Sequence, residues 1–462
     1  MRSPDDCTLS IPPELLSRVF QLAQHVPLGS DWGDRKRPLE MVVSHVSGFW
    51  RDVALGTGLL WQQIRVEPEC SMDRLRLYLS RSGPQTPLHL HLNLTPRAPH
   101  GPETLAEKLD LVFQHLHRWQ RVTVHAQIEC AEAPFIGRLY DQAAPMLEWL
   151  GLCVHDVDAP TLRTLRRSDL EQILTRGCPR LSVVRLRGLS MHFFRPPLST
   201  ITTLHLEQTR DIVLGFEGFK NLVSAAPMLT HLSIHDNIVN DLYEERWPFH
   251  RVSSVIAHSL ISLRLSIPAT LQGVFSGVLI TLDAPNLATL ILKEPTHGDL
   301  DEFISMPGAS TKFPALRSLT FYDFDCNSVD DLCQLCAVFP LVEEFTLIHN
   351  TVEVPSVLLM LADEGGRHPE PWPALNALHI TLDANDLPLV RDAVDRRRKV
   401  GRPLEVLRLS PSIFEDAEDG DLDAQDVLDW LCANVRVVEP LISIERWPPG
   451  SNEDDPDDTL FS

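Results

Sequence analysis

The chain has 462 residues, of which 44 % are hydrophobic, 23 % are charged and 71 are leucine, and its formal net charge is −22. This composition supplies enough apolar material for a folded core, and the length allows two or three domains or one extended array. The negative charge argues against non-specific binding to nucleic acid or to an anionic membrane, because phosphates repel such a field.

The sequence also bounds the expected compartment. The residues that follow Met1 contain no apolar stretch typical of a secretory signal, and no apolar run approaches the ~18–20 residues that span a bilayer. The nine cysteines are odd in number and lack a framework spacing, which indicates reduced thiols. We therefore expect a cytoplasmic or nuclear protein, or one found in both compartments.

The first sixty residues contain three apolar stretches. Helical spacing predicts one helix from Pro12 to about Phe20, and a second over residues 42–54. Gly48 would lie inside the second helix, at a cost of roughly 1 kcal/mol. The third stretch is Leu59–Ile64. Together they predict a small helical module.

The order I-P-P-E-L-L, then V-S-H-V-S-G-F-W-R-D-V-A, then L-L-W resembles an F-box. The resemblance implies a three-helix F-box over residues 9–64 that docks the Skp-type adaptor of a cullin–RING ubiquitin ligase. The adaptor-binding residues that it implies are Ile11, Pro12, Leu15, Leu16, Val19, Val43, Val46, Trp50, Leu60 and Trp61. Two alternatives stay open: any single anchor packs inside the module, or the whole module is a helical cap on the array that follows.

Residues 65–142 are expected to form a linker and the first strand and helix units. Leu88–Leu94 alternates between apolar and polar residues, as a strand with one buried face does. The spacing Trp119/Val122/Val124 then matches, weakly, the repeat that follows.

A repeat of the form L-x-x-L-x-L organises residues 143–445. Ten copies occur, and seven of them carry a proline two residues ahead of the first apolar position. The first apolar residues of the copies are Leu147, Leu181, Ile201, Leu229, Leu260, Leu287, Leu316, Val342, Leu375 and Leu404. The last two apolar residues of a copy point to one face of a short strand, and the first lies in the entering turn. Stretches with helical spacing, such as residues 328–339, separate the copies.

This pattern resembles the irregular members of the leucine-rich-repeat family. The resemblance implies an α/β solenoid with parallel strands inside and helices outside, because a single unit cannot bury its apolar edge alone. A module that resembles an F-box, two strand-like segments and then such repeats is an order similar to that of F-box proteins of mushroom-forming fungi. Residues 446–462, which are rich in acidic side chains, are expected to form a disordered tail.

The repeat predicts which residues line the open face of the strands. Twenty positions lie between or directly after the two apolar strand residues of the ten copies, and five of these positions are basic while one is acidic. The basic residues are Arg185, Arg187, Arg264, Lys293 and Arg408. They suggest binding to an acidic or phosphorylated segment of a protein substrate. The alternative is that strands simply disfavour aspartate.

Catalytic and metal-binding motifs are absent from the sequence. It contains no phosphate-binding G-x-x-x-x-G-K-[ST], no G-x-S-x-G and no H-E-x-x-H, so we expect neither an enzyme nor a cofactor. The pair Cys333 and Cys336 has no second pair to complete a zinc site, so both thiols are expected to be buried. Residues 415–423 do not match a calcium-binding loop and are expected to form a solvated acidic loop. The basic run 396–399 suits a helix C-terminus better than a nuclear-import signal.

These features predict a substrate-recognition subunit of an SCF-type cullin–RING ubiquitin ligase. In that reading the N-terminal module docks the adaptor while the repeats hold the substrate. The alternative is a leucine-rich-repeat scaffold without a ligase role.

Overall fold

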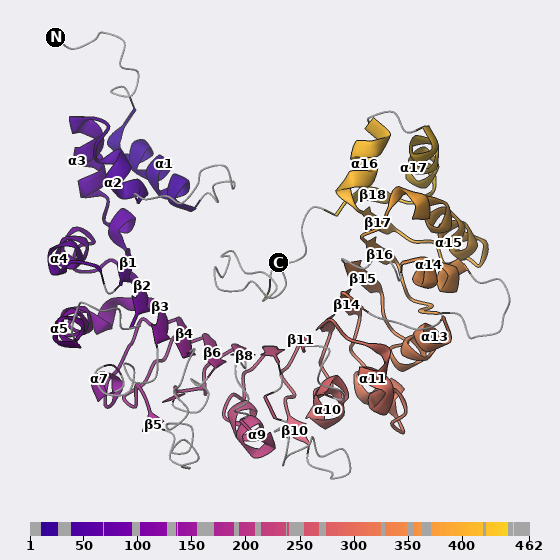
Figure 1. Cartoon of the computed structure of the whole chain (residues 1–462), viewed down its shortest axis with the longest axis horizontal. Helices are drawn as coiled ribbons and strands as arrows, with labels where there is room; N and C mark the ends of the chain where they lie inside the picture. The colour runs from indigo at the N-terminus through magenta and orange to yellow at the C-terminus, as the bar shows by residue number, and fades with distance from the viewer. Residues whose placement is uncertain are drawn as a thin grey trace, which may run out of the picture. The chain divides into compact units, whose positions relative to one another are not determined.

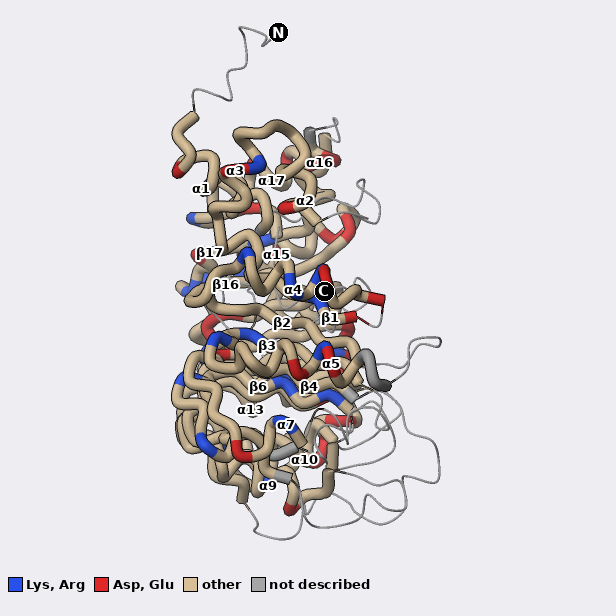
Figure 2. Tube along the Cα trace, turned by 90° about the vertical axis from the view of Figure 1, so that its left-hand side faces the viewer, with Lys and Arg blue, Asp and Glu red and all other residues tan. Residues whose placement is uncertain are grey.

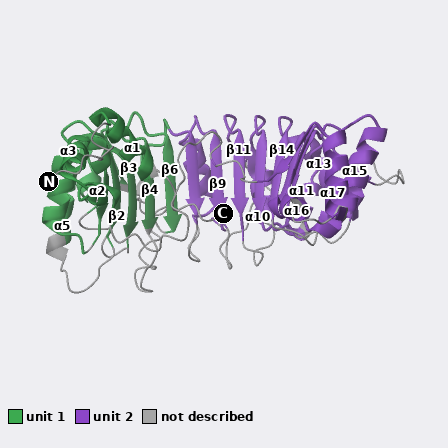
Figure 3. Ribbon diagram, turned by 90° about the horizontal axis from the view of Figure 1, so that it is seen from above, with its two compact units in different colours: residues 1–200 green, residues 201–462 purple. Residues whose placement is uncertain are grey.

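A computed structural model describes most of the chain. The described residues are 11–25, 38–67, 69–94, 102–126, 135, 137–154, 171–188, 194–207, 214–236, 238–239, 254–267, 274–324, 329–348, 354–362, 371–418, 422–441 and 447. Two compact units divide the chain, residues 1–200 and residues 201–462 (Figure 3). The charged loop 26–37 and the acidic residues after Trp447 lie outside the described residues.

The first unit begins with short helices and continues with alternating strands and helices. Its helical segments are α1 (Pro13–His25), α2 (Leu39–Val43), α3 (Gly48–Gly56), η2 (Gly58–Trp61), α4 (Met72–Arg81), α5 (Pro102–Phe113), η3 (Leu116–Arg118) and α7 (Gly137–Leu139). Its main strands are β1 (Gln63–Val66), β2 (Leu88–Asn93), β3 (Trp119–Ala126), β4 (Trp149–Val154) and β6 (Val183–Gly188), and they pair in this order, all parallel. A minor parallel pair joins β5 (Glu171–Gln172) to β7 (Phe194–Arg195).

The second unit continues the alternation with nine main strands. They are β8 (Thr203–Glu207), β9 (His231–His235), β11 (Ser262–Ser266), β13 (Thr289–Lys293), β14 (Ser318–Tyr322), β15 (Glu344–Ile348), β16 (Ala377–Ile380), β17 (Val406–Leu409) and β18 (Val437–Pro440). Each pairs in parallel with the next, and a minor pair joins β10 (Val255–Ile256) to β12 (Leu282–Asp283).

The helical segments of the second unit are α9 (Phe216–Ser224), α10 (Val274–Thr281), α11 (His297–Ile304), α12 (Ala309–Lys312), α13 (Val329–Val338), α14 (Val354–Ala362), η6 (Ala384–Asp386), α15 (Leu387–Lys399), α16 (Pro411–Glu418) and α17 (Leu422–Asn434). Figure 1 shows α9, α10, α11, α13, α14, α15 and α17 together on one side of the strands, with α16 at the end of the series beside β18. The predicted α/β class with parallel strands is therefore confirmed. Among the described residues, every helix is too short or too polar to cross a lipid bilayer.

A proline-led turn introduces most of the repeat strands. The amide N–H of Leu147 donates to the carbonyl of Ala144 at 3.2 Å, and Leu229 repeats this bond with Ala226 at 3.1 Å. Proline occupies the second position of each turn, where its fixed φ suits the required backbone. The turn thus sets the first leucine of the repeat inside and starts the strand two residues later.

The repeat leucines form the core. In β11, Leu263 and Leu265 have no measurable exposure, and Leu260 in the preceding turn is equally buried. The strands pair in register, so Leu263 lies beside Leu290 of β13 and each leucine continues a buried row across the unit. At about 25 cal/mol per Å² of apolar area buried, these rows are the main source of cohesion between successive strands.

The N-terminal module differs from the prediction in two places: Ile64, at the end of the third apolar stretch, lies in β1 rather than in a helix, and the second helix is interrupted. The expected continuous helix over 42–54 is wrong: α2 ends at Val43, a turn follows, and α3 begins at Gly48. The side chain of Ser47 caps α3 by accepting from the Trp50 amide at 3.1 Å. Gly48 is therefore the first residue of a helix rather than an interior one, and the expected cost of about 1 kcal/mol does not apply.

Part of the expected acidic loop at 415–423 is also helical. Glu415 and Glu418 lie in α16, while residues 419–421 lie outside the described residues. The helical segment forms because Ile413 and Ala417, four residues apart, are both buried. The predicted helix at 328–339 is confirmed as α13.

The basic run 396–399 forms the last turn of α15, as expected for cations near a helix C-terminus. Arg397 is buried, and its guanidinium donates to the carbonyls of Pro371, Trp372 and Leu375 at 3.4, 3.3 and 2.8 Å. Gly401 ends the helix with a φ of 77°, a left-handed conformation that glycine adopts readily. The run is thus part of the structural framework.

We predict that Arg397→Met lowers the free energy of unfolding by roughly 1.5–3 kcal/mol, because three carbonyls lose a charged donor. Urea denaturation of the full chain, followed by circular dichroism, measures the change. Arg398→Met is the matched control, since Arg398 is exposed on the same turn, and it should change the midpoint little. Equal midpoints for the two variants would contradict the structural role of Arg397.

Candidate protein-interaction surfaces

The N-terminal module has a small core of its own. Leu16 and Phe20 are buried on α1, and Leu60 and Trp61 are buried on η2. The Trp61 indole N–H donates to the Ala54 carbonyl at 2.9 Å, which fixes η2 against α3. Phe20 also contacts the ring of Trp50, with 5.0 Å between the ring centroids.

The structure divides the ten predicted adaptor-binding residues between the inside and the outside of the module. The buried members are Leu16, Val43, Leu60 and Trp61, and the half-buried members are Ile11 and Trp50. The exposed members are Pro12, Leu15, Val19 and Val46. The buried four are enclosed by the module and, in the case of Trp61, also by α4, so only the other six offer surface to a partner.

An apolar stripe runs along the outer side of α1. Leu15 and Val19 are 59 % and 53 % exposed, and Leu22, which the motif did not single out, continues the stripe at i, i+4, i+7 spacing. Val42 and Val46, at the end of α2 and in the turn after it, are also exposed. Single exposed leucines are common on proteins, but a helical stripe of large aliphatic side chains is typical of an interaction surface.

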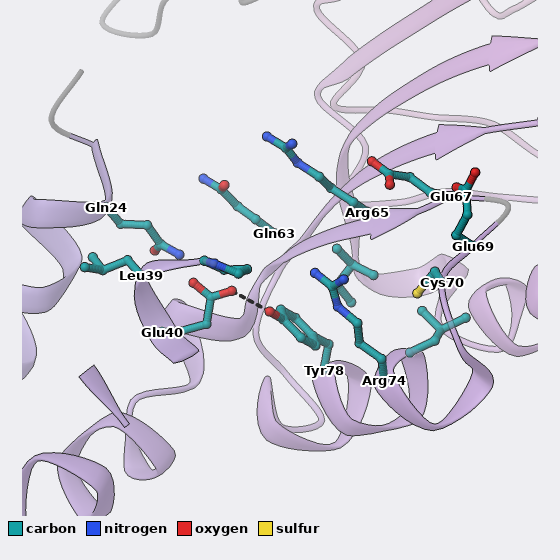
Figure 4. Close-up of a pocket in the computed structure, with 13 residues that line it drawn as sticks. Gln24, Leu39, Glu40, Gln63, Arg65, Glu67, Glu69, Cys70, Arg74 and Tyr78 are labelled. Carbon is teal, nitrogen blue, oxygen red and sulfur yellow. Dashed lines mark hydrogen bonds between the residues drawn. The ribbon is translucent and has the colours of Figure 1, made fainter. Parts of the chain in front are cut away.

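A polar pocket of about 540 Å³ lies where the module meets β1 and α4 (Figure 4). The buried carboxylate of Glu40 accepts a hydrogen bond of 2.5 Å from the Tyr78 hydroxyl at its wall. Burial, and then the contact with Glu40, raises the pKa of the Tyr78 phenol above its usual value. Glu67, Arg65 and Arg74 also line the pocket, so its charges are mixed.

Aromatic contacts join the module to α4. The ring of Trp61 meets Tyr78 edge to face at 5.2 Å, and the guanidinium of Arg81 lies 4.4 Å from the Trp61 ring. Gln24 of α1 adds a hydrogen bond of 3.1 Å to the Leu60 carbonyl. One side of the module is therefore packed against the first strand and helix unit, while the α1 stripe stays exposed.

In the second unit, the residues between the two inward-facing positions of each main strand form one row across nine strands, which we call the polar row because all but Ile291 are polar. Register pairs connect them in sequence: His205, Ser233, Arg264, Ile291, Thr320, Thr346, His379, Arg408 and Glu439. Neighbours in the row are about 4.8 Å apart, so long polar side chains reach one another. Most of the row is buried, which differs from the open lining that the repeat predicted.

Arg264 sits in a network of hydrogen bonds near one end of this row. Its Nε donates to Ser233 Oγ at 3.0 Å, and its Nη2 donates to His205 Nδ1 at 3.4 Å. A guanidinium has no acceptor, so Nδ1 of His205 must carry the lone pair. The Nε2 of the same ring faces Glu207 at 3.7 Å.

The opposite end of the row repeats this pairing of arginine with histidine. Arg408 donates to His379 Nε2 at 3.1 Å and forms an ion pair of 2.6 Å with Glu439. His379 Nδ1 then faces Thr346 at 3.2 Å. Burial, reinforced by the Arg408 charge, lowers the pKa of His379 to about 4, so the ring is neutral near pH 7.

The five predicted substrate-binding basic residues do not form one cluster within either unit. Arg185 and Arg187 lie on β6 of the first unit, and Figure 2 shows the blue of Lys and Arg residues near the β6 and β4 labels. Arg264 and Lys293 lie on the neighbouring strands β11 and β13. Arg408 is four strands beyond β13, or roughly 19 Å away.

Trp447 is a contact residue that the sequence did not identify, because it falls in the expected disordered tail. Its ring lies 4.3 Å from the Arg264 guanidinium. Placing this one side chain against the strands corrects the expectation of disorder at residue 447. A lone tryptophan after the last predicted strand carries no signal of where it docks.

The expectation of a buried cysteine pair holds for Cys336, while Cys333 is half-buried. Cys336 is buried in α13, where its Sγ lies 3.6 Å from Met360 Sδ, and burial raises the pKa of its thiol well above the usual value. Among the described residues, no three His, Cys, Asp or Glu side chains are placed to hold a metal ion.

Comparisons with known proteins leave the family open. No family model matches the chain, and no curated protein matches it. One similar solved structure is a structural-genomics target from Bacteroides fragilis with 13 % sequence identity and a TM-score of 0.31. The match covers 65 % of this chain and 77 % of that protein, and a likeness at this level carries no functional argument.

We predict that His379 makes the protein less stable in acid. Because its pKa is about 4 when folded and near 6.5 when unfolded, the unfolded chain binds more protons below pH 6.5. Stability should therefore fall by up to roughly 3 kcal/mol as the pH drops from about 6.5 to 4. His379→Gln should flatten this part of the curve of urea midpoint against pH. Parallel curves for wild type and His379→Gln would refute the assignment.

Proposed function

We propose that the chain is a substrate-recognition subunit of an SCF-type cullin–RING ubiquitin ligase. Residues 9–64 form an F-box that docks a Skp-type adaptor, and the strand and helix units form a leucine-rich-repeat solenoid that binds a protein substrate. The observation that carries this proposal is the exposed apolar stripe of Leu15, Val19 and Leu22 on a helix whose other side is buried.

The size of the module supports a partner on that side. Three short helices and one 3-10 turn bury few side chains, and a module of about 50 residues has limited independent stability. Covering the α1 stripe with an adaptor would bury three large aliphatic side chains, which are the type of anchor that dominates interface energetics when desolvated.

The proposed mechanism is proximity rather than catalysis by this chain. Holding the substrate and the ligase on one chain makes ubiquitin transfer effectively intramolecular. The basic side chains on this side of the strands, Arg264 and Arg408 in the polar row and Lys293 beside it, suit an acidic or phosphorylated segment. Such a subunit needs no cofactor and acts in the cytoplasm or nucleus, where these ligases operate.

We predict that the full chain co-purifies with a Skp-type adaptor in a 1:1 complex and that Leu15→Asp weakens this complex at least tenfold. A buried carboxylate without a partner opposes docking of the stripe. Leu422→Asp is the matched control, because Leu422 is 81 % exposed at the start of α17, remote in the sequence from the module. Co-expression, pull-down and calorimetric titration measure the effect. Absence of adaptor binding to the wild-type chain would overturn the proposal.

A second function is supported by the contacts on the inner side of the module. Trp61, Tyr78 and Arg81 pack η2 onto α4, as expected if the helices cap the end of a repeat array. In that case the chain is a repeat scaffold that binds other proteins without a ligase role.

We predict that Tyr78→Phe lowers the stability of the first unit by about 1–3 kcal/mol, because the buried Glu40 carboxylate loses its donor. Thermal unfolding of the full chain measures this, with Tyr140→Phe at an exposed tyrosine as the control. If the module is both cap and F-box, Tyr78→Phe leaves adaptor affinity unchanged at a temperature where the variant is folded. If it is a cap alone, both Tyr78→Phe and wild type fail to bind the adaptor.

A further inference from the structure

Trp447 reaches back to strands that lie far before it in the sequence. Its indole N–H donates to Ser262 Oγ at 3.2 Å, a contact across 185 residues. Its ring covers Arg264 at a centroid distance of 4.3 Å, within the range of a cation–π interaction. The ring is thus held both by a directional hydrogen bond and by stacking on a cation.

The surface under Trp447 is built to receive an aromatic ring. Arg264 is only 2 % exposed, and its bonds to Ser233 and His205 hold the guanidinium in place. The rings of His205 and His231 lie 6.3 and 6.2 Å from the indole, at steep angles of 62° and 81°. Edge-to-face rings around a flat cation form a cradle, which we call the Arg264 cradle: His205, His231, Ser262 and Arg264.

The charge state of the cradle suits this role. Burial lowers the pKa of His231, so that ring is neutral near pH 7 and offers an aromatic edge rather than a second cation. Arg264 remains the positive group against which an electron-rich indole stacks.

The tether makes Trp447 a strong internal competitor for the cradle. The amide N–H of Leu441 donates a hydrogen bond of 2.7 Å to the Leu409 carbonyl, which fixes Leu441 to the strand region, and five residues separate it from Trp447. A short tether gives an effective concentration in the millimolar range, so a separate ligand must displace Trp447 to bind. Trp447 as a whole residue is half-buried rather than sealed in the interior.

The segment around Trp447 also indicates the chemistry of the ligand. After the tryptophan come two prolines, a glycine and two polar residues, and then five acidic residues within 453–458. A ligand that competes for the same cradle shares its anchor, an exposed tryptophan. Acidic residues downstream would add attraction to the basic side chains of this face, among them Lys293 on the strand next to β11.

We propose that the Arg264 cradle is a binding site for a partner segment in which a tryptophan precedes acidic residues, and that Trp447 occupies this site in cis until the partner displaces it. That the partner is a ligase substrate rests on the proposed function above. The cradle itself does not depend on an adaptor, so the two are tested separately.

The test uses the full-length chain and a fluorescein-labelled synthetic peptide with the sequence of residues 440–462. Trp447→Ala empties the cradle, so this variant should bind the peptide at least tenfold more tightly than wild type in fluorescence anisotropy. The same peptide with alanine in place of its tryptophan should lose at least tenfold in affinity for the variant. This peptide control leaves the folded protein unchanged.

Two further variants locate the site. Adding Arg264→Gln to Trp447→Ala should abolish peptide binding, whereas adding Arg317→Gln, at a more exposed arginine just before β14, should not. If the Arg264 variant does not fold, Ser262→Ala replaces it and should weaken binding.

Three results would overturn the proposal. If Trp447→Ala does not bind the peptide, the cradle is not a binding site for such a segment. If wild type binds the peptide as tightly as Trp447→Ala does, Trp447 does not occupy the site in cis. A wild-type dimer that Trp447→Ala abolishes, seen by light scattering, shows that Trp447 docks on a second copy instead. None of these measurements involves the adaptor. A failed adaptor pull-down would therefore count against the proposed function but not against the Arg264 cradle as a binding site.

Discussion

In-register parallel pairing of the strands is the constraint on which the other features of each unit depend. Leu263 lies beside Leu290, and both are fully buried, so each strand fixes the side-chain direction of the next. A slip of one residue would send these leucines to the polar side. The same pairing places Arg264 beside Ser233 on the other side, which means that the polar row and the apolar core are two results of one register.

The polar row shows how basic groups are accommodated on such a surface. Buried Arg264 and half-buried Arg408 each donate to a ring nitrogen of a buried histidine. A neutral imidazole accepts at one nitrogen and donates at the other, so it can pass a hydrogen bond along the row without adding a second charge. The positive charge of the row is therefore confined to Arg264, which contacts the Trp447 indole, and Arg408, which contacts the Glu439 carboxylate. It does not form a uniform basic face.

The N-terminal module has an inner side that packs against the rest of its unit and an outer side that is exposed. Leu16 and Phe20 pack inward, and Leu15 and Val19 face outward, although all four belong to one apolar stretch of α1. The inner contacts are enough to fix the module against α4 through Trp61 and Tyr78. The outer side chains have no role in that packing, and exposed aliphatic side chains at helical spacing are what a docking partner would cover.

The sequence by itself determined the strands and the core, because the spacing L-x-x-L-x-L fixes which side chains share a face and proline fixes the entering turn. The sequence also showed that α1 carries apolar residues at helical spacing. It did not show which of them face the core of the module, since Leu15 and Leu16 are equally apolar. Gly48 starts a helix because Ser47 caps it locally, which the apolar spacing alone does not show. Only the tertiary structure decided that Arg397 is a buried donor and that Trp447 covers Arg264. Those two outcomes depend on contacts between residues far apart in the chain, for which local spacing carries no information.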